Sequence, residues 1–512
     1  MSFSIRSVMT GKSLNISQLA SVLLLLALVF LLPACRKGNT GDGRVAEIRE
    51  KKEKPIDFDF EKIKERGSLI ALVDNSSTGY FIYRGRPMGY EYDLLDRLAK
   101  DLGVTLRIKL TANIEEAFAM LNSGDADIMA YHLTVTKERS RRVAFTDAHT
   151  QVRQVLIQRK PDDWRKLKVH EIENSLIRNP LELVGKEVHS RKGSSYSSRL
   201  QNLSEEIGGD IIIIEQAGQT DTEMLIKRVA DGDIDYCVAD EDVGMINATY
   251  YPNIDAKTPI SFPQNIAWAV RNNAPVLRDT VNQWLRKVKA TPDFNVIYNR
   301  YFKYRKSQNL RAHSIYSSVN GLGISPYDDM IKQGAEQLGM DWMLLASLVY
   351  QESKFDPKVE SWAGAKGFMQ LTNESIERYK VEDPFNAEQN FWGGINFLRY
   401  LSDFWAERVP DENERLKFIL ASYNVGQGHV LDAVKLARKY DRDEAVWDDN
   451  VAHFIIQKMK PEFYNDPEVQ FGYCRGHEPV NYVSQILNRY DQYRTAFENP
   501  VAEGDSTLVT SR

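Results

Sequence analysis

One glutamate in the C-terminal part of the chain has a sequence context suited to acid catalysis. Glu352 follows Leu348 by four positions and Leu345 by seven, within an apolar run. We expect a helix over residues 342–353. In it these spacings place the carboxyl on the same face as the apolar side chains. A carboxyl held among apolar groups loses hydration, so its pKa should rise toward the neutral range. The pattern therefore predicts a carboxylic acid that is still protonated near neutral pH, as a general acid must be.

The segment after this predicted helix should form a loop that a ligand can approach closely. It reads SWAGAKGFMQL over residues 361–371, and its two glycines permit tight backbone turns. A second carboxylate, Asp356, is followed directly by Pro357, which should take it out of the helix. Glycosidases that hydrolyse their substrates usually need two carboxylates, and here only Glu352 is well placed. A single acid would suffice where the attacking hydroxyl belongs to the substrate itself.

Four short segments occur in a fixed order, QES, GAKGFMQL, ASYNVG and EPVNYV, at residues 351–353, 364–371, 421–426 and 478–483. Together they resemble the lysozyme-like domain of the soluble-lytic-transglycosylase family, whose fold is similar to goose-type lysozyme. The resemblance implies that Glu352 protonates the β-1,4 glycosidic oxygen between N-acetylmuramic acid and N-acetylglucosamine. The same carboxylate then takes the 6-hydroxyl proton while a 1,6-anhydro ring closes. Matching positions imply substrate-binding roles for six residues: Ser353 orients Glu352, Tyr482 points its hydroxyl toward Glu352, Met369 and Gln370 line the cleft, and Tyr423 and Asn424 contact the substrate.

The whole chain has the composition of a globular protein with more than one domain. Its 512 residues exceed the usual size of one domain, and 43% are hydrophobic, which argues against wholesale disorder. The net charge of −5 gives no reason to expect a nucleic-acid partner. The sequence has no cluster of Cys and His with metal-ligand spacing, so we expect neither a metal nor a cofactor. Cys237 and Cys474 fall in different predicted domains, which makes a disulfide framework unlikely.

The N-terminus reads as a targeting segment. Residues 1–34 begin with basic residues and contain an apolar run, 20–32, that is short for a membrane span but typical of a signal peptide. The run ends in LPAC, which resembles a bacterial lipobox and implies lipidation of Cys35; the alternative is a plain secretory signal with an incidental cysteine. Residues 35–57 are polar and predict a tether. We therefore expect a lipid-anchored protein of the cell envelope, at the outer membrane and facing the periplasm.

Residues 58–303 alternate between predicted strands and helices, which indicates an α/β domain. Strict alternation over residues 104–110 predicts a strand with one solvated face, whereas residues 211–214 predict a buried strand. The segments at 89–94, 133–139, 145–147 and 233–240 resemble the family-3 extracellular solute-binding proteins, which are two-lobed and close on amino acids by a hinge. The resemblance implies ligand contacts for Thr134, Arg139, Ser194, Ser195 and Asp240.

In that family the arginine clamps the ligand carboxylate and the aspartate takes the amino group. A guanidinium forks onto a carboxylate well, so this chemistry is sensible. The alternative is that Arg139 belongs to a surface run of arginines and that Asp240 is one acid among several. Tyr131 and His132 depart from the amino-acid binders, so the ligand can be a muropeptide instead of an amino acid.

Residues 304–322 predict a linker, residues 323–498 a mostly helical lysozyme-like domain, and residues 499–512 a frayed tail. The combination resembles the membrane-bound lytic murein transglycosylase F group. The first hypothesis is therefore a peptidoglycan lytic transglycosylase whose activity is regulated by a peptide or amino acid bound to the α/β domain. The second is a lipoprotein receptor with an inactive lysozyme-like module, and the third is a muramidase, a hydrolase of the same fold. The presence of Glu352 favours an enzyme over the receptor.

Overall fold

The computed structural model describes residues 55–111, 113–216, 220–304, 311, 314–318 and 323–498. The predicted signal peptide, Cys35, most of the tether, most of the linker and the tail at 499–512 lie outside these residues. Within the described ranges, no helix is both long enough and apolar enough to cross a membrane.

The first lobe of the α/β domain is built on a five-stranded sheet. Its strands, in spatial order, are β4 (Thr105–Leu110), β1 (Ser68–Val73), β5 (Ile128–Met129), β14 (Ala269–Val270) and β6 (Ala144–Phe145). Strand β1 pairs in parallel with β4 and β5, while β14 runs antiparallel to both of its neighbours. The helices of this lobe are α2 (Phe60–Arg66), α3 (Tyr90–Leu102), α4 (Ile114–Ser123), α9 (Pro275–Lys289) and α10 (Pro292–Phe302).

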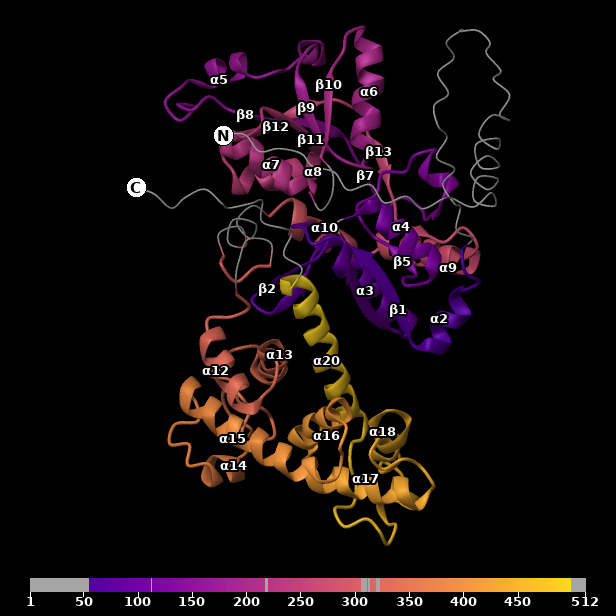
Figure 1. Ribbon diagram of the computed structural model, residues 1–512, viewed down its shortest axis with the longest axis vertical. Helices are drawn as coiled ribbons and strands as arrows, with labels where there is room; N and C mark the ends of the chain where they lie inside the picture. Colours follow the sequence, from indigo (N-terminus) through magenta and orange to yellow (C-terminus); the bar gives the residue numbers. More distant parts are fainter. Residues whose placement is uncertain are drawn as a thin grey trace, which may run out of the picture. The chain divides into compact units, whose positions relative to one another are not determined.

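The second lobe repeats this plan with a second five-stranded sheet, whose strands and helices are drawn in purple to magenta in Figure 1. Its strands, in spatial order, are β10 (Ile212–Gln216), β9 (Glu187–Arg191), β11 (Tyr236–Asp240), β8 (Gln154–Arg159) and β12 (Ile254–Pro259). Its helices are α5 (Val169–Ser175), α6 (Ser195–Ile207), α7 (Thr222–Asp231) and α8 (Glu241–Tyr250). Each lobe has buried clusters of its own, and Cys237 lies unpaired inside the second lobe.

The chain crosses between the lobes twice. It leaves the first lobe after β6 through β7 (Thr150–Val152) and returns through β13 (Gln264–Ile266), and these two short strands pair antiparallel. A two-stranded connection of this kind is a hinge, because few residues absorb the rotation of one lobe against the other. The two lobes and the hinge agree with the expected two-lobed α/β architecture.

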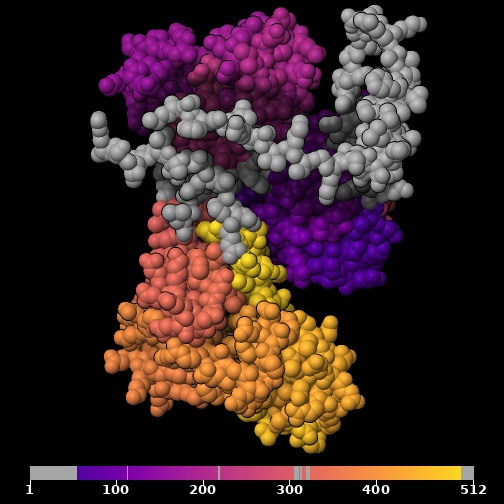
Figure 2. All heavy atoms as spheres, viewed as in Figure 1, coloured from indigo at the N-terminus to yellow at the C-terminus, as the bar shows by residue number. Residues whose placement is uncertain are grey.

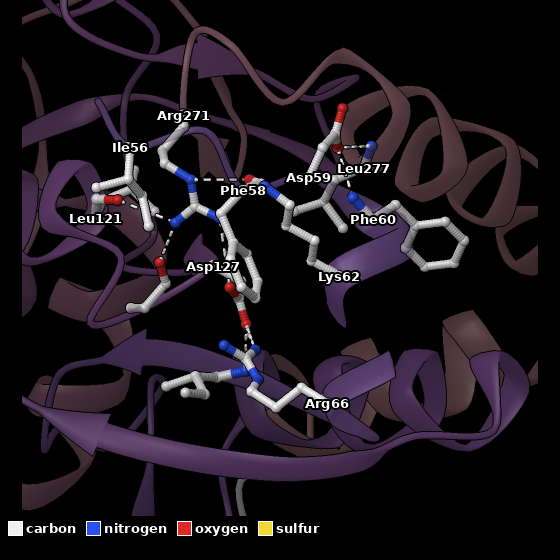
Figure 3. Close-up of polar contacts among 12 residues, drawn as sticks. Ile56, Phe58, Asp59, Phe60, Lys62, Arg66, Leu121, Asp127, Arg271 and Leu277 are labelled. Carbon is white, nitrogen blue, oxygen red and sulfur yellow. Dashed lines mark hydrogen bonds and ion pairs between the residues drawn. The ribbon is translucent and has the colours of Figure 1, made fainter. Parts of the chain in front are cut away.

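The first described residues are fastened to the first lobe by charged groups (Figure 3). The buried Arg271 donates two hydrogen bonds to the carbonyl of Phe58 and a third to the carbonyl of Leu121. Asp127 lies beside the same guanidinium and also accepts from Arg66. The chain that arrives from the predicted tether is therefore fixed in place before the first strand begins.

A short hairpin of β2 (Phe81–Tyr83) and β3 (Arg86–Met88) completes the strands of the α/β domain.

The second domain is helical, as expected, and runs from orange to yellow in Figures 1 and 2. The helices of the helical domain are α12 (Asp328–Leu338), α13 (Trp342–Ser353), α14 (Asn373–Arg378), α15 (Ala387–Ala406), α16 (Glu412–Val425), α17 (Gln427–Lys439), α18 (Ala452–Gln457), α19 (Pro461–Tyr464) and α20 (His477–Glu498).

One expectation about the sheets is wrong. The isoleucine run at 211–214 was expected to be a buried strand, but β10 is an edge strand of its sheet, and its residues are exposed or only partly buried. A run of isoleucines encodes β propensity, which does not distinguish an edge strand from a central one.

Candidate active site

Helix α13 positions Glu352. It begins at an N-cap, Asp341, whose carboxylate accepts a hydrogen bond from the backbone N–H of Met343, and the residues from Met343 to Val349 are all buried. It ends one residue after Glu352, because Lys354 and Phe355 both adopt left-handed backbone conformations, with φ of 55° and 64°. The ring of Phe355 is buried against Tyr350 and Phe368, which holds this strained reversal in place. Asp356 therefore lies outside the helix and is exposed, as expected.

Glu352 has the electrostatic character that the sequence predicted. The residue is partly exposed, but burial of its carboxyl raises the pKa to about 7, while a hydrogen bond from Tyr482 acts in the opposite direction. The Tyr482 hydroxyl donates this bond to a carboxyl oxygen of Glu352. Within the described part of the chain, no second carboxylate acts on this pKa. A substantial fraction of the Glu352 side chains therefore carries a proton at neutral pH.

Helix α20 delivers Tyr482 to the carboxyl by lying antiparallel along α13. Tyr490 donates to Asp341 at the start of α13, at 2.8 Å. Gln351 donates to Gln485 at 2.9 Å near the end of α13. These contacts fix the register of two segments that are far apart in sequence, so the position of Tyr482 is set by the helix pair and not by a local turn.

The loop after α13 is clamped to the rest of the domain. The Ser353 hydroxyl donates to the carbonyl of Phe368 at 2.8 Å, which ties the residue after Glu352 to the far side of the loop. At Gly367, with φ of +81°, a Cβ atom would meet the carbonyl oxygen of Pro384 at 2.0 Å, so only glycine fits. Asn390 on α15 accepts from the backbone N–H of Met369 and donates to two backbone carbonyls.

The remaining residues that the resemblance implied fall around this loop. The Tyr423 hydroxyl donates to the carbonyl of Met369 at 2.8 Å, and burial together with the nearby Glu352 raises the pKa of Tyr423 well above its ordinary value. Asn424 follows at the end of α16 and is exposed. The backbone of Gln370 is left-handed, and its side-chain amide donates to two carbonyls of the loop. The Met369 side chain is fully buried, and its backbone N–H and carbonyl are bonded to Asn390 and Tyr423, so the expected substrate contact of Met369 has no support in the structure.

In the α/β domain, Arg139 reaches from the first lobe to the second. Its guanidinium donates to the carbonyls of Thr134 and of Gly193, at 3.0 and 3.1 Å. Arg139, Ser194 and Ser195 line one cavity of about 380 Å³. Ser194 caps helix α6, and the Ser195 hydroxyl accepts from Gln154. The cavity is lined mostly by polar and charged side chains, so it suits a polar ligand.

Asp240 is buried and is not among the residues that line this cavity. Burial raises its pKa to about 7, although His132 and Arg139 are close enough to lower it. Its Oδ1 atom has no hydrogen-bond partner among the described residues. A buried carboxyl oxygen without a partner is unusual, because most buried polar atoms are hydrogen-bonded.

A buried ion network beside Asp240 could not be predicted. His132 has a left-handed backbone with φ of 52°, and its two ring nitrogens lie 3.2 Å from Glu91 and 3.1 Å from Asp242. Although burial opposes it, Asp242 and Glu91 raise the pKa of His132 well above its ordinary value. The imidazolium therefore links the two lobes. The only sequence signal for this network was that His132 departs from the pattern of the family-3 solute-binding proteins. Asn390 gave no signal either, because two of its three partners lie more than 20 residues away in the sequence.

Comparison with known proteins agrees with both halves of the chain. The model of the bacterial extracellular solute-binding proteins, family 3, matches residues 69–304, and the model of the transglycosylase SLT domain matches residues 329–446. A membrane-bound lytic murein transglycosylase F of Desulfosudis oleivorans is 35% identical over 84% of this chain and 90% of its own length. One from Pseudomonas fluorescens is 29% identical over 87% and 88%. An ancestral arginine-binding protein bound to arginine shares 22% identity and a TM-score of 0.39, covering 46% of this chain and 99% of that one.

The similarity to the first relative runs through both domains and covers nine-tenths of that protein. The order of the two matched domains is the one that the sequence predicted. The chain belongs to the membrane-bound lytic murein transglycosylase F family, and it is a peptidoglycan lytic transglycosylase of the cell envelope.

Proposed function

We propose that Glu352 is the single acid and base of the lytic reaction. The observation that carries this proposal is its pKa of about 7 in a partly exposed position, held by the Tyr482 hydroxyl. The protonated carboxyl gives its proton to the glycosidic oxygen between N-acetylmuramic acid and N-acetylglucosamine, and the C–O bond breaks. The carboxylate that remains accepts the proton of the muramoyl 6-hydroxyl, whose oxygen closes the 1,6-anhydro ring. No water is consumed, so Glu352 ends the cycle protonated as it began.

The other residues around the carboxyl position the substrate in this scheme. Ser353 fixes the loop beside Glu352, and Tyr423 holds the Met369 carbonyl. In this scheme Gln370 and Tyr423 line the cleft. The exposed Asn424 contacts the sugar. A muramidase would need a second carboxylate to activate water, and Asp356, the nearest in sequence, lies exposed outside the helix. This arrangement favours the lyase over the hydrolase.

The test uses Glu352→Gln, which keeps the shape of the side chain but cannot donate the proton. The variant should lose at least the roughly 10²–10⁴-fold typical of general acid–base catalysis. Mass spectrometry of digested sacculi reads the reaction type, because anhydromuropeptides are lighter by one water than reducing-end products. Activity within tenfold of wild type would exclude Glu352 as the acid, and reducing ends alone would favour a hydrolase.

We also propose that the α/β domain senses a cell-wall stem peptide or amino acid and changes the activity. Arg139 would bind a ligand carboxylate, with Thr134, Ser194 and Ser195 around it, and Asp240 would bind an amino group. The unpartnered Oδ1 atom of Asp240 and the polar cavity at Arg139 support this proposal. For an allosteric effect the coupling should be on the order of 1–3 kcal/mol and reciprocal between peptide and glycan.

Calorimetry with stem peptides on the full-length protein tests the binding, and Arg139→Lys is the matched variant because it keeps the charge but loses the planar fork. Turnover with and without peptide tests the coupling. Peptide that binds without changing turnover would make the domain a targeting module. If no peptide binds, the sensor proposal is wrong.

We further propose that Cys35 carries a lipid anchor and that residues 35–57 tether the enzyme to the outer membrane, facing the periplasm. The LPAC sequence at the end of the apolar run supports the anchor. The relatives are named membrane-bound, which agrees with an anchored protein. Several acyl chains on one cysteine would hold the protein firmly, because stable anchoring needs more than one chain.

A further inference from the structure

An aromatic surface that the proposed reaction does not use lies on two loops of the helical domain. Trp362 is 89% exposed, and Phe471 and Tyr473 are each more than half exposed. The guanidinium carbon of Arg475 lies 5.7 Å from the centre of the Trp362 ring. Single exposed apolar residues are common, but an exposed indole paired with an arginine offers a ligand both an apolar face and a cation. The contact also joins the loop after α13 to the loop before α20.

The backbone holds the Trp362 ring in its exposed position. Gly364 donates its backbone N–H to the carbonyl of Ser361 at 2.9 Å, which closes a tight turn with Trp362 at its tip. Ser361 and Ala365 are joined by two more bonds, one between their backbones at 2.8 Å and one from the Ala365 N–H to the Ser361 hydroxyl at 3.0 Å. Because the turn is already ordered, a ligand that covers the indole has little backbone entropy to overcome.

Both loops lead directly to the residues around Glu352. Arg475 lies two residues before α20, which begins at His477 and carries Tyr482 about 7.5 Å further along its axis, at about 1.5 Å per residue. The ring of Phe471 lies against Gly428, where a Cβ atom would meet it at 2.5 Å. Gly428 follows Asn424 by four residues. The exposed rings therefore border the same segments that surround the acid.

We infer that Trp362 and Arg475 form a subsite for a part of the glycan strand beyond the two sugars that flank the cleaved bond. The C–H face of a saccharide ring packs on the indole, and Arg475 donates to a carboxylate carried by the strand. Arg475 already pairs with Glu478 at 3.4 Å, but both side chains are mostly exposed. An exposed pair of this kind contributes little, so a substrate carboxylate can compete for the guanidinium. This inference rests on the transglycosylase function.

Kinetics on strands of different length test the subsite in the full-length protein. Trp362→Ala should raise KM for long glycan strands about tenfold, the size expected for truncating a tryptophan at a binding surface, with kcat within about twofold. The shortest oligosaccharide that is cleaved should show no change, and Trp362→Phe should recover most of the loss. Phe262→Ala is the matched control, because this ring is 84% exposed in the α/β domain. An unchanged KM on long strands, or an equal loss on short ones, would overturn the subsite.

A binding measurement separates this inference from the reaction chemistry. In Glu352→Gln, long strands should bind without turnover and change the tryptophan fluorescence, and adding Trp362→Phe should remove that change. Wild-type activity that gives anhydro products, together with an unchanged KM in Trp362→Ala, would refute only the subsite.

Strands freed of their stem peptides by an amidase show what each side chain binds. The Trp362→Ala effect should persist on them, and so should a rise in KM caused by Arg475→Gln, because hydrolysis of the amide leaves a lactyl carboxylate on each muramoyl residue of the strand. If the Trp362→Ala effect disappears instead, the indole binds peptide and the sugar-stacking inference is wrong.

Discussion

Replacing Tyr482 by Phe removes the hydroxyl that donates to Glu352 and leaves the ring in place. Burial raises the pKa of Glu352 to about 7, and the bond from Tyr482 lowers it, because the donor stabilises the carboxylate. Without the donor, the charged form loses this stabilisation while the burial remains. The pKa of Glu352 in Tyr482→Phe should therefore lie above its value in the wild type.

The size of the shift follows from the energy of a charged hydrogen bond. Such a bond contributes about 1.5–3 kcal/mol, and one pKa unit corresponds to about 1.36 kcal/mol. The phenol also contacts the protonated acid, so only part of this energy distinguishes the two forms, and we expect a rise of about one unit. The wild-type value itself matters for catalysis. At pH 7 about half of the Glu352 side chains are protonated, against about one in 300 at the ordinary value of 4.5.

The assay is kcat/KM against pH on soluble glycan strands. The first step needs the protonated acid, so the wild-type rate should fall tenfold per pH unit above about 7. In Tyr482→Phe this descending limb should move up by about one unit. Tyr423→Phe is the matched control, because its hydroxyl donates to the carbonyl of Met369 and not to Glu352. A limb that stays in place or moves down in Tyr482→Phe would refute the assigned role of the donor, even if activity falls.

Three further predictions concern stability, the loop and the anchor. The folded pKa of Glu352 lies above its ordinary value of 4.5, so its contribution to the free energy of unfolding is fully present below pH 4.5 and is lost as pH rises through about 7. In calorimetry, Glu352→Gln should therefore be more stable than wild type at pH 8, by about 1–2 kcal/mol after allowing for partial exposure. At pH 4 the variant should be no more stable than wild type. Gly367→Ala should destabilise the helical domain and abolish turnover, because its Cβ would meet the carbonyl of Pro384 at 2.0 Å; thermal unfolding at the wild-type temperature would contradict this. Cys35→Ala should lose palmitate labelling and leave the protein soluble or with its signal uncleaved; unchanged labelling would exclude the lipid anchor.

Features that depend on residues close together in the sequence could be predicted from local patterns. The spacing of apolar residues predicted a helix over 342–353, and α13 spans Trp342–Ser353, because an N-cap and an apolar run fix its start and direction. The same run predicted the raised pKa of Glu352, since desolvation depends on the nearest turns of the helix. The contact between Tyr482 and Glu352 was expected only from the family resemblance, because it depends on how α20 packs along α13.

Contacts between segments that are far apart in the sequence could not be predicted from local patterns. Asn390 is one polar residue in an apolar helix, and nothing around it indicates that it clamps the Met369 backbone. The bridge from His132 to Asp242 depends on both lobes meeting across the hinge. Its formation is a property of the assembled domain, so no window of sequence can contain it.

Backbone strain gives independent support to these placements. Eight non-glycine residues in the described ranges have positive φ. Three of them, Lys354, Phe355 and Gln370, lie in the loop around the acid, and a fourth is His132 between the lobes. Each such residue costs about 1–3 kcal/mol and persists only where the surrounding structure fixes it. Phe355 is fixed by its buried ring, and His132 by two carboxylates. Strain held in this way makes a side chain point where local folding would not place it, and in this respect His132 is as strongly constrained as the loop that follows Glu352.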